Sequence, residues 1–154
     1  ERFCRETGIT LLDDYALIDL FGEPTLLTHG DLLCTDDVPY QAFREKSRAQ
    51  EWQQNILSKP LFLRLLGARW YRLRSQLHKR KKKLEIMDVN QQAVIEVMRK
   101  HKALRLIHAH THRPDIHDPE SDGKTAQRFV LAQWTKNSGS VLCWNDNRFQ
   151  IETL

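Results

Sequence analysis

Short apolar runs bounded by turn residues predict several β-strands in this chain. Residues 15–20 and 25–29 flank Phe21-Gly22-Glu23-Pro24, and this arrangement predicts a β-hairpin that delivers His29-Gly30-Asp31 at the end of a strand. Residues 104–107 predict a short buried strand that leads into a group of histidines. Three runs near the end of the chain, separated by Asn-containing turns, also predict strands: 128–134, 140–144 and 148–153.

Helical spacing of apolar residues dominates the middle of the chain. Residues 38–58 predict one helix, with Asp36 and Asp37 as candidate caps and Pro39 in its first turn. A second helix is predicted to start at Pro60, because large apolar residues recur on one face: Leu61, Phe62, Leu65, Leu66, Trp70, Leu73 and Leu77.

Two more helices complete the pattern. The opening residues end at Gly8, which is typical of a helix C-terminus, and Asp88 or Asn90 begins a helix predicted to run to Lys102. The mixed order of strands and helices predicts an α/β or α+β fold.

Composition narrows the class of protein. The 154 residues are in the range of one domain, no run approaches the roughly 18 apolar residues of a membrane span, and the first residues lack the apolar region of a signal peptide. These features predict a soluble, cytoplasmic protein. The cysteines, Cys4, Cys34 and Cys143, lie far apart, so we expect them to be reduced rather than paired or bound to zinc.

Charge is unevenly distributed, although the net charge is only +4. Residues 60–83 contain nine Lys or Arg and no acidic residue. One interpretation is a core-packed helix with solvated charges, and a second is nucleic-acid binding, which no stacking pattern or reader motif supports. A third is an amphipathic cap that meets an anionic glycolipid at a membrane surface, with cations on the headgroup and apolar side chains on the acyl chains.

Candidate chemistry is concentrated in the sequence LIHAHTHRP, residues 106–114. His108, His110 and His112 alternate, so they would point the same way in an extended segment, and neutral imidazole is a common metal ligand. The bland alternative is a set of histidines that fill a turn after a strand. Three ligands seldom complete a catalytic site, and His29-Gly30-Asp31 is the best candidate to supply more.

Taken together, HGDLLCTDD, the following YQAFR, the mid-chain IMDVNQ and IHAHTHRP resemble the UDP-2,3-diacylglucosamine diphosphatases, a family of calcineurin-like metallophosphoesterases that acts in lipid A synthesis. The resemblance runs in register from about Glu1 to Trp134. It implies a four-layer α/β sandwich, with a helical cap insertion at about residues 38–83. It also implies a peripheral location on the cytoplasmic side of the inner membrane of a Gram-negative bacterium.

The resemblance assigns roles to particular residues. It implies that His29, His110 and His112 are metal ligands for two Mn²⁺ ions, and that His110 also lies near the reacting phosphate. His108 is not a ligand in the family pattern and is expected to hold the turn. The implied substrate contacts are Asp37, Ser75, Lys79, Lys82 and His110. Asp37 is equally well explained as a helix cap, on the sequence alone.

Two residues depart from the family pattern. Lys79 replaces an asparagine, which puts that contact in doubt. Ala109 replaces a glycine, so alanine is expected either to strain the turn or to mark a relaxed variant.

The implied reaction is hydrolysis of UDP-2,3-diacylglucosamine to UMP and 2,3-diacylglucosamine 1-phosphate. The family's first three motifs, D-x-H, G-D and G-N-[RH]-D, do not occur in their expected positions, which predicts that residues 1–154 are a C-terminal part of the enzyme and inactive alone. Asp115-Ile116-His117 spells D-x-H formally, but its position predicts a surface loop. The alternatives are another nucleotide diphosphate or phosphodiester hydrolase of this fold, or a non-catalytic membrane-surface module. Neither nucleic acid nor an obligate protein partner is expected.

Overall fold

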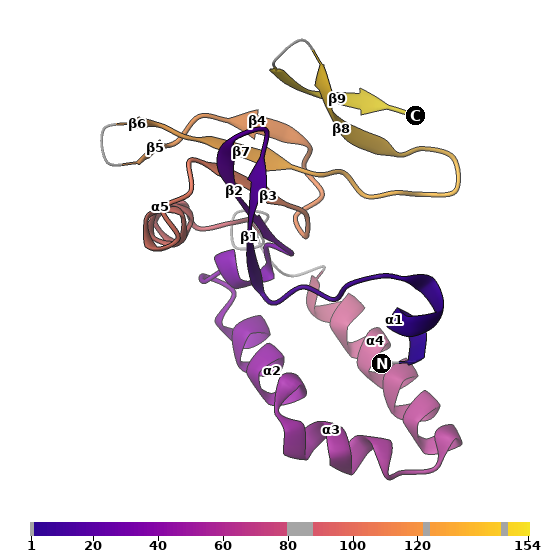
Figure 1. Ribbon diagram of the computed structural model, residues 1–154. Helices are drawn as coiled ribbons and strands as arrows, with labels where there is room; N and C mark the ends of the chain where they lie inside the picture. Colours follow the sequence, from indigo (N-terminus) through magenta and orange to yellow (C-terminus); the bar gives the residue numbers. More distant parts are fainter. Residues whose placement is uncertain (1, 80–87, 122–123, 146–147) are drawn as a thin grey trace. The chain divides into compact units, whose positions relative to one another are not determined.

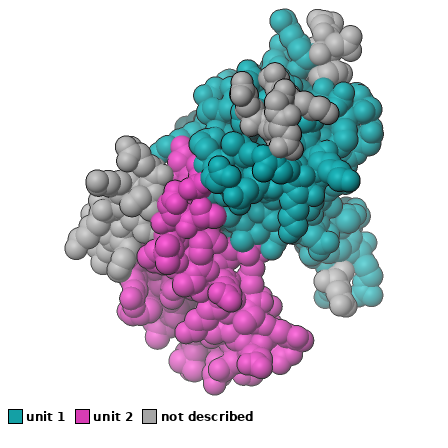
Figure 2. Space-filling model, turned by 90° about the vertical axis from the view of Figure 1, so that its left-hand side faces the viewer, with its two compact units in different colours: residues 1–33, 91–154 teal, residues 34–90 magenta. Residues whose placement is uncertain are grey.

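The computed structural model describes residues 2–79, 88–121, 124–145 and 148–154 (Figure 1). These residues form two compact units, one made of residues 1–33 and 91–154 and the other of residues 34–90 (Figure 2). The first unit contains the main sheet with His29, His108, His110 and His112, and the second contains a set of helices. No helix within the described ranges is both long enough and apolar enough to span a bilayer.

The first unit begins with α1 (Arg2–Thr7), which ends as predicted. Gly8 has a φ of 71°, and its N–H donates to the Cys4 carbonyl at 2.9 Å. A left-handed residue that returns a hydrogen bond to the last turn is a common helix terminus, and glycine adopts this conformation without steric cost.

A hairpin follows, made of β1 (Tyr15–Leu20) and β2 (Glu23–Thr28). The predicted strands are confirmed, but the turn is Phe21-Gly22 alone, because Leu20 pairs directly with Glu23. Both turn residues have positive φ, 58° and 79°, as a two-residue type I′ turn requires. Pro24 therefore lies in a strand, one residue before the pairing of β2 with its second neighbour begins at Thr25.

The main sheet has the strand order β1-β2-β3-β7-β4. Strands β3 (Arg105–His108) and β7 (Gln127–Val130) run parallel to β2, and Thr28 is in register with His108. Helix α5 (Gln91–Lys100) precedes β3 and buries Val94, Val97 and Met98. The sheet contributes Leu26, Leu106 and Phe129 to the same core, each at most 1% exposed.

The predicted surface loop at residues 115–117 is wrong. These residues form β4 (Asp115–His117), which pairs antiparallel with β7. Backbone pairing along the free edge of β7 stabilises this short strand, although its sequence lacks apolar alternation. Two shorter strands, β5 (Glu120–Ser121) and β6 (Lys124–Thr125), also pair and were not predicted.

The last strands, β8 (Ser140–Asn145) and β9 (Arg148–Thr153), form the expected antiparallel hairpin. The Phe149 ring lies 4.6 Å from the Phe129 ring, so the hairpin contacts the core of its unit. The run predicted for 128–134 is shorter than expected and ends at Val130. Within the part of the chain that the structure describes, no disulfide joins Cys4, Cys34 or Cys143.

The second unit contains α2 (Val38–Arg48), α3 (Gln50–Leu57) and α4 (Leu61–Lys79). The single helix predicted for residues 38–58 is therefore wrong: it breaks at Ala49, which is extended with a φ of −61° and a ψ of 129°. The helix predicted from Pro60 is present and is described as far as Lys79. The described residues thus form a mixed α/β fold with a mixed sheet.

Candidate functional site

The candidate site lies where two parallel strands end side by side. His29 follows β2 directly, and residues 109–112 follow β3. Because β2 and β3 are parallel and in register, their carboxyl ends meet at one edge of the sheet. The Ala109 N–H donates to the His29 carbonyl at 3.1 Å and ties the two strand ends together.

This arrangement brings two of the predicted ligands together. His29 Nε2 lies 3.2 Å from His110 Nδ1, with ring centroids 4.9 Å apart and an angle of 73° between the ring planes. For zinc, the distance from an imidazole nitrogen to the metal is about 2.0–2.1 Å. Two ligand nitrogens that subtend an angle of roughly 90–109° at the metal therefore lie about 2.9–3.4 Å apart. The pair therefore fits a shared metal ion, and the same separation also permits a direct hydrogen bond.

The turn after β3 is not extended. His110 and His112 have positive φ values of 60° and 53°, and the Thr111 N–H donates to the Ala109 carbonyl at 2.7 Å. The prediction that three alternate histidines converge in an extended segment is therefore wrong. Within the residues that the structure describes, no three His, Cys, Asp or Glu side chains are close enough to hold one metal ion, so His112 does not join the His29–His110 pair.

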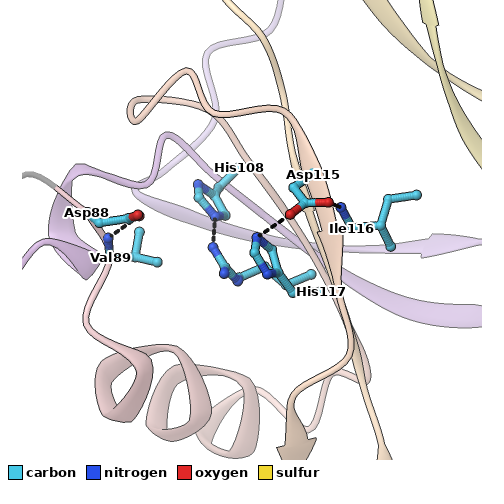
Figure 3. A network of polar contacts seen from close by, with 7 residues as sticks. Asp88, Val89, His108, Asp115, Ile116 and His117 are labelled. Carbon is cyan, nitrogen blue, oxygen red and sulfur yellow. Dashed lines mark hydrogen bonds and ion pairs between the residues drawn. The ribbon is translucent and has the colours of Figure 1, made fainter. Parts of the chain in front are cut away.

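His108 has a different environment from the other two histidines. It is 1% exposed, and both of its ring nitrogens have protein partners; Figure 3 shows the contact made by one of them. Nδ1 lies 3.0 Å from the Ala109 carbonyl oxygen, and Nε2 lies 3.2 Å from Nη1 of Arg128. These contacts support a structural role, because they occupy the lone pair that a metal would need. The contact of Arg128 with His108 was not predicted from the sequence. The one sequence feature that could have indicated it is a charged residue inside an otherwise apolar predicted strand.

Glycine is required at the position after His29. Gly30 has a φ of 103°, and a Cβ atom there would lie only 2.8 Å from Nδ1 of His108. Its carbonyl also accepts from the Leu33 N–H at 3.0 Å, which starts the short 3-10 helix η1 (Asp31–Leu33). The absence of a side chain therefore lets the two strand-end turns pack closely.

Relatives with known names match almost the whole chain. The chain is 46% identical over 141 residues to the UDP-2,3-diacylglucosamine hydrolase of Enterobacter sp. (strain 638), covering 92% of the chain and 59% of that protein. For the Vibrio vulnificus (strain CMCP6) protein of the same name, the identity is 46% over 153 residues, covering 99% of the chain and 62% of the relative. The Salmonella typhi hydrolase is 44% identical over 147 residues, covering 96% and 61%.

Over almost its whole length, the chain is similar to UDP-2,3-diacylglucosamine hydrolases.

The chain spans about 60% of the length of these members of the UDP-2,3-diacylglucosamine hydrolase family. No protein-family model matches it. The matches cover 92–99% of the chain.

The remaining residues expected to bind substrate in this hydrolase family belong to the second unit. Asp37 is the N-cap of α2 and accepts from the Tyr40 N–H at 3.1 Å, while Ser75 is exposed on α4. Lys79 is the last residue of α4, and Lys82 lies outside the described residues. All four stay predictions, and for Asp37 the cap explains its position directly.

Proposed function

We propose that this chain forms the histidine-bearing part of a metal-dependent hydrolase that cleaves UDP-2,3-diacylglucosamine to UMP and 2,3-diacylglucosamine 1-phosphate in lipid A synthesis. The observation that carries the proposal is the 3.2 Å separation of His29 and His110 at the ends of two parallel strands. The proposed substrate is taken from the name of the relatives, UDP-2,3-diacylglucosamine hydrolase.

The proposed cofactor is a pair of Mn²⁺ ions. His29 and His110 would hold one ion and His112 the other, with further ligands from residues outside this chain. Such a pair lowers the pKa of bound water and stabilises charge on the reacting phosphate. Separate roles for His110 and His112 are supported by the lack, among the described residues, of three His, Cys, Asp or Glu side chains that could hold a single metal ion.

The second unit is the proposed contact for the lipid part of the substrate. On α4, six large apolar side chains are 57–67% exposed: Leu61, Phe62, Leu65, Leu66, Trp70 and Leu73. The core-packed interpretation of this helix does not explain that exposure. Together with the cationic sequence of residues 60–83, it supports a helical cap that holds acyl chains and rests on the anionic cytoplasmic face of the inner membrane. We also propose that the complete domain has the four-layer α/β sandwich fold that the resemblance implies.

UMP release from UDP-2,3-diacylglucosamine tests this function. For this test, the chain is joined to the part of the Vibrio vulnificus relative that its match does not cover, and the product is called the extended protein. Hydrolysis is measured with and without Mn²⁺. We expect Mn²⁺-dependent UMP release that His110→Ala or His112→Ala lowers at least about a hundredfold, because each removes a metal ligand. His117→Ala is the matched control, because His117 is not one of the proposed metal ligands. It lies on β4, where its Nε2 is 3.7 Å from Oδ2 of Asp115 (Figure 3).

Three results would contradict the proposal. Full turnover in His110→Ala would exclude the ligand role, and faster hydrolysis of a soluble nucleotide diphosphate would favour another phosphoesterase. Binding to anionic vesicles without hydrolysis of either substrate would favour a non-catalytic membrane-surface module.

A further inference from the structure

Arg128 and His108 form a buried polar pair in the middle of the main sheet. Arg128 lies on β7 and His108 ends β3, its parallel neighbour. Their exposed fractions are 3% and 1%, and Nη1 of Arg128 lies 3.2 Å from Nε2 of His108. Burying a guanidinium is costly unless its hydrogen bonds are retained, so this pair calls for a functional or structural explanation.

The chemistry of the partners fixes the direction of both hydrogen bonds. A guanidinium group can only donate, so Nε2 of His108 must accept. The Ala109 carbonyl oxygen, 3.0 Å from Nδ1, can only accept, so Nδ1 must carry the proton. The two contacts together fit the tautomer with the proton on Nδ1 and the lone pair on Nε2.

The proton on His108 Nδ1 is shared with the carbonyl oxygen of Ala109, the residue that links the two strand-end turns. The Ala109 carbonyl accepts from His108 Nδ1 and from the Thr111 N–H, while the Ala109 N–H donates to the His29 carbonyl at 3.1 Å. Ala109 thus holds the backbone of His29 on one side and of Thr111 on the other, and His110 lies between Ala109 and Thr111 in the chain. A His108 ring with its proton on Nε2 would place a lone pair against the Ala109 oxygen and weaken this arrangement.

We propose that Arg128 is a positioning residue for the histidine site: by donating to His108 Nε2, it fixes the tautomer whose Nδ1–H holds the Ala109 carbonyl and so sets the separation of His29 and His110. Arg128 touches neither metal nor substrate in this account. Its importance for hydrolysis rests on the proposed function, whereas the tautomer and the geometry of the turn do not.

The tautomer is measured directly on this chain. Long-range ¹H–¹⁵N correlation of the imidazole rings at fixed pH distinguishes a protonated from an unprotonated ring nitrogen, and His108→Gln assigns the His108 signals. We expect a protonated Nδ1 and an unprotonated Nε2, retained in Arg128→Lys, which keeps a donor, and mixed or reversed in Arg128→Met. A protonated Nε2 in the unsubstituted chain would overturn the proposal.

A double-mutant cycle tests whether Arg128 acts through His108. The affinity for Mn²⁺ alone is measured from the paramagnetic broadening of the His29 and His110 ring signals. Arg128→Met should lower this affinity roughly five- to tenfold, because the carbonyl that holds the turn loses a fixed donor. In a His108→Asn background, Asn Nδ2 can donate in place of Nδ1 and has no second tautomer, so Arg128→Met should change affinity less than about twofold there.

The outcomes separate this inference from the proposed function. Equal losses with and without His108→Asn would show that Arg128 acts by another route and would overturn the inference. Absence of UMP release from the extended protein would count against the proposed function alone. Native-like circular dichroism and unfolding midpoints are required of every variant, and Arg128→Lys supplies the comparison if Arg128→Met fails to fold.

Discussion

At the scale of single residues, the backbone of the histidine turn is left-handed at two positions. The residue between β3 and the first of these positions has a negative φ. His110 and His112 have positive φ values, whereas Ala109 does not. Access to positive φ, one of the two reasons for a glycine at position 109, is therefore not needed there. The conformational demand for glycine falls instead on Gly30, which packs against His108.

Substitution of Ala109 tests that conclusion. Ala109→Gly should lower the free energy of unfolding by about 0.5–1 kcal/mol, because it relieves no strain and gives the unfolded chain more freedom. His112→Gly is the matched comparison: its exposed parent has a φ of 53°, so this change should be neutral or stabilising. Urea unfolding of both variants measures the difference, and a stabilised Ala109→Gly would show that strain is present after all.

Asp37 has two possible roles that one pair of substitutions separates. It accepts from the Tyr40 N–H as the N-cap of α2, and the family resemblance expects it to contact substrate. Asp37→Ala should cost about 1 kcal/mol of stability, while Asp37→Asn, which retains a capping oxygen, should cost a few tenths.

The two variants are compared by thermal unfolding and by the KM of the extended protein. A raised KM in a fully stable Asp37→Asn protein would establish the substrate contact. An Asp37→Ala protein as stable as the parent would contradict the cap.

At the scale of elements, the sequence predicts the helices and strands whose ends are set by residues next to them in the chain. The hairpin at residues 15–28, the terminus of α1 at Gly8 and the hairpin β8–β9 follow from turn residues and apolar runs that lie beside the structure they produce. The break at Ala49 could not be predicted, because alanine favours helices and the residues around it continue the helical pattern. Likewise, β4 exists because β7 offers an edge, which is a property of distant sequence.

The turn of the first hairpin contains a correctable defect. Phe21 adopts a φ of 58°, which is unfavourable for an aromatic residue, and its side chain is 60% exposed. Phe21→Asn creates the Asn-Gly pair that a type I′ turn prefers, and it should raise the free energy of unfolding by about 0.5–1 kcal/mol.

Phe21→Ala is the control for this effect, because it removes the exposed ring but keeps a residue that disfavours positive φ. The midpoints of thermal unfolding distinguish the two variants. A Phe21→Asn protein no more stable than Phe21→Ala would mean that the turn is not of this type in solution.

At the scale of the whole molecule, the candidate metal site lies within one unit. The strands that supply His29 and His110 are separated in sequence by residues 34–90, which form the second unit, yet they pair directly in the sheet. The sequence indicated both strand ends and both histidines. It did not indicate that Arg128, on a third strand, contacts His108, because that contact depends on the order β2-β3-β7.

The candidate substrate contacts other than His110, by contrast, belong to the second unit. There, the resemblance supplied the residues, and the structure adds the exposed apolar face of α4 and the capping role of Asp37. The chain spans about 60% of the length of its relatives, so the extended protein is the proper material for assays of the complete reaction.

The central claim is that His29 and His110 bind one metal ion. Pulsed EPR of Mn²⁺ bound to the extended protein measures it most directly, since ¹⁴N couplings report imidazole nitrogens bound to the metal. We predict that His29→Ala and His110→Ala each remove one such nitrogen from the same Mn²⁺ ion, while His117→Ala changes nothing. An identical nitrogen signal in all three variants, or none in the parent protein, would contradict the account.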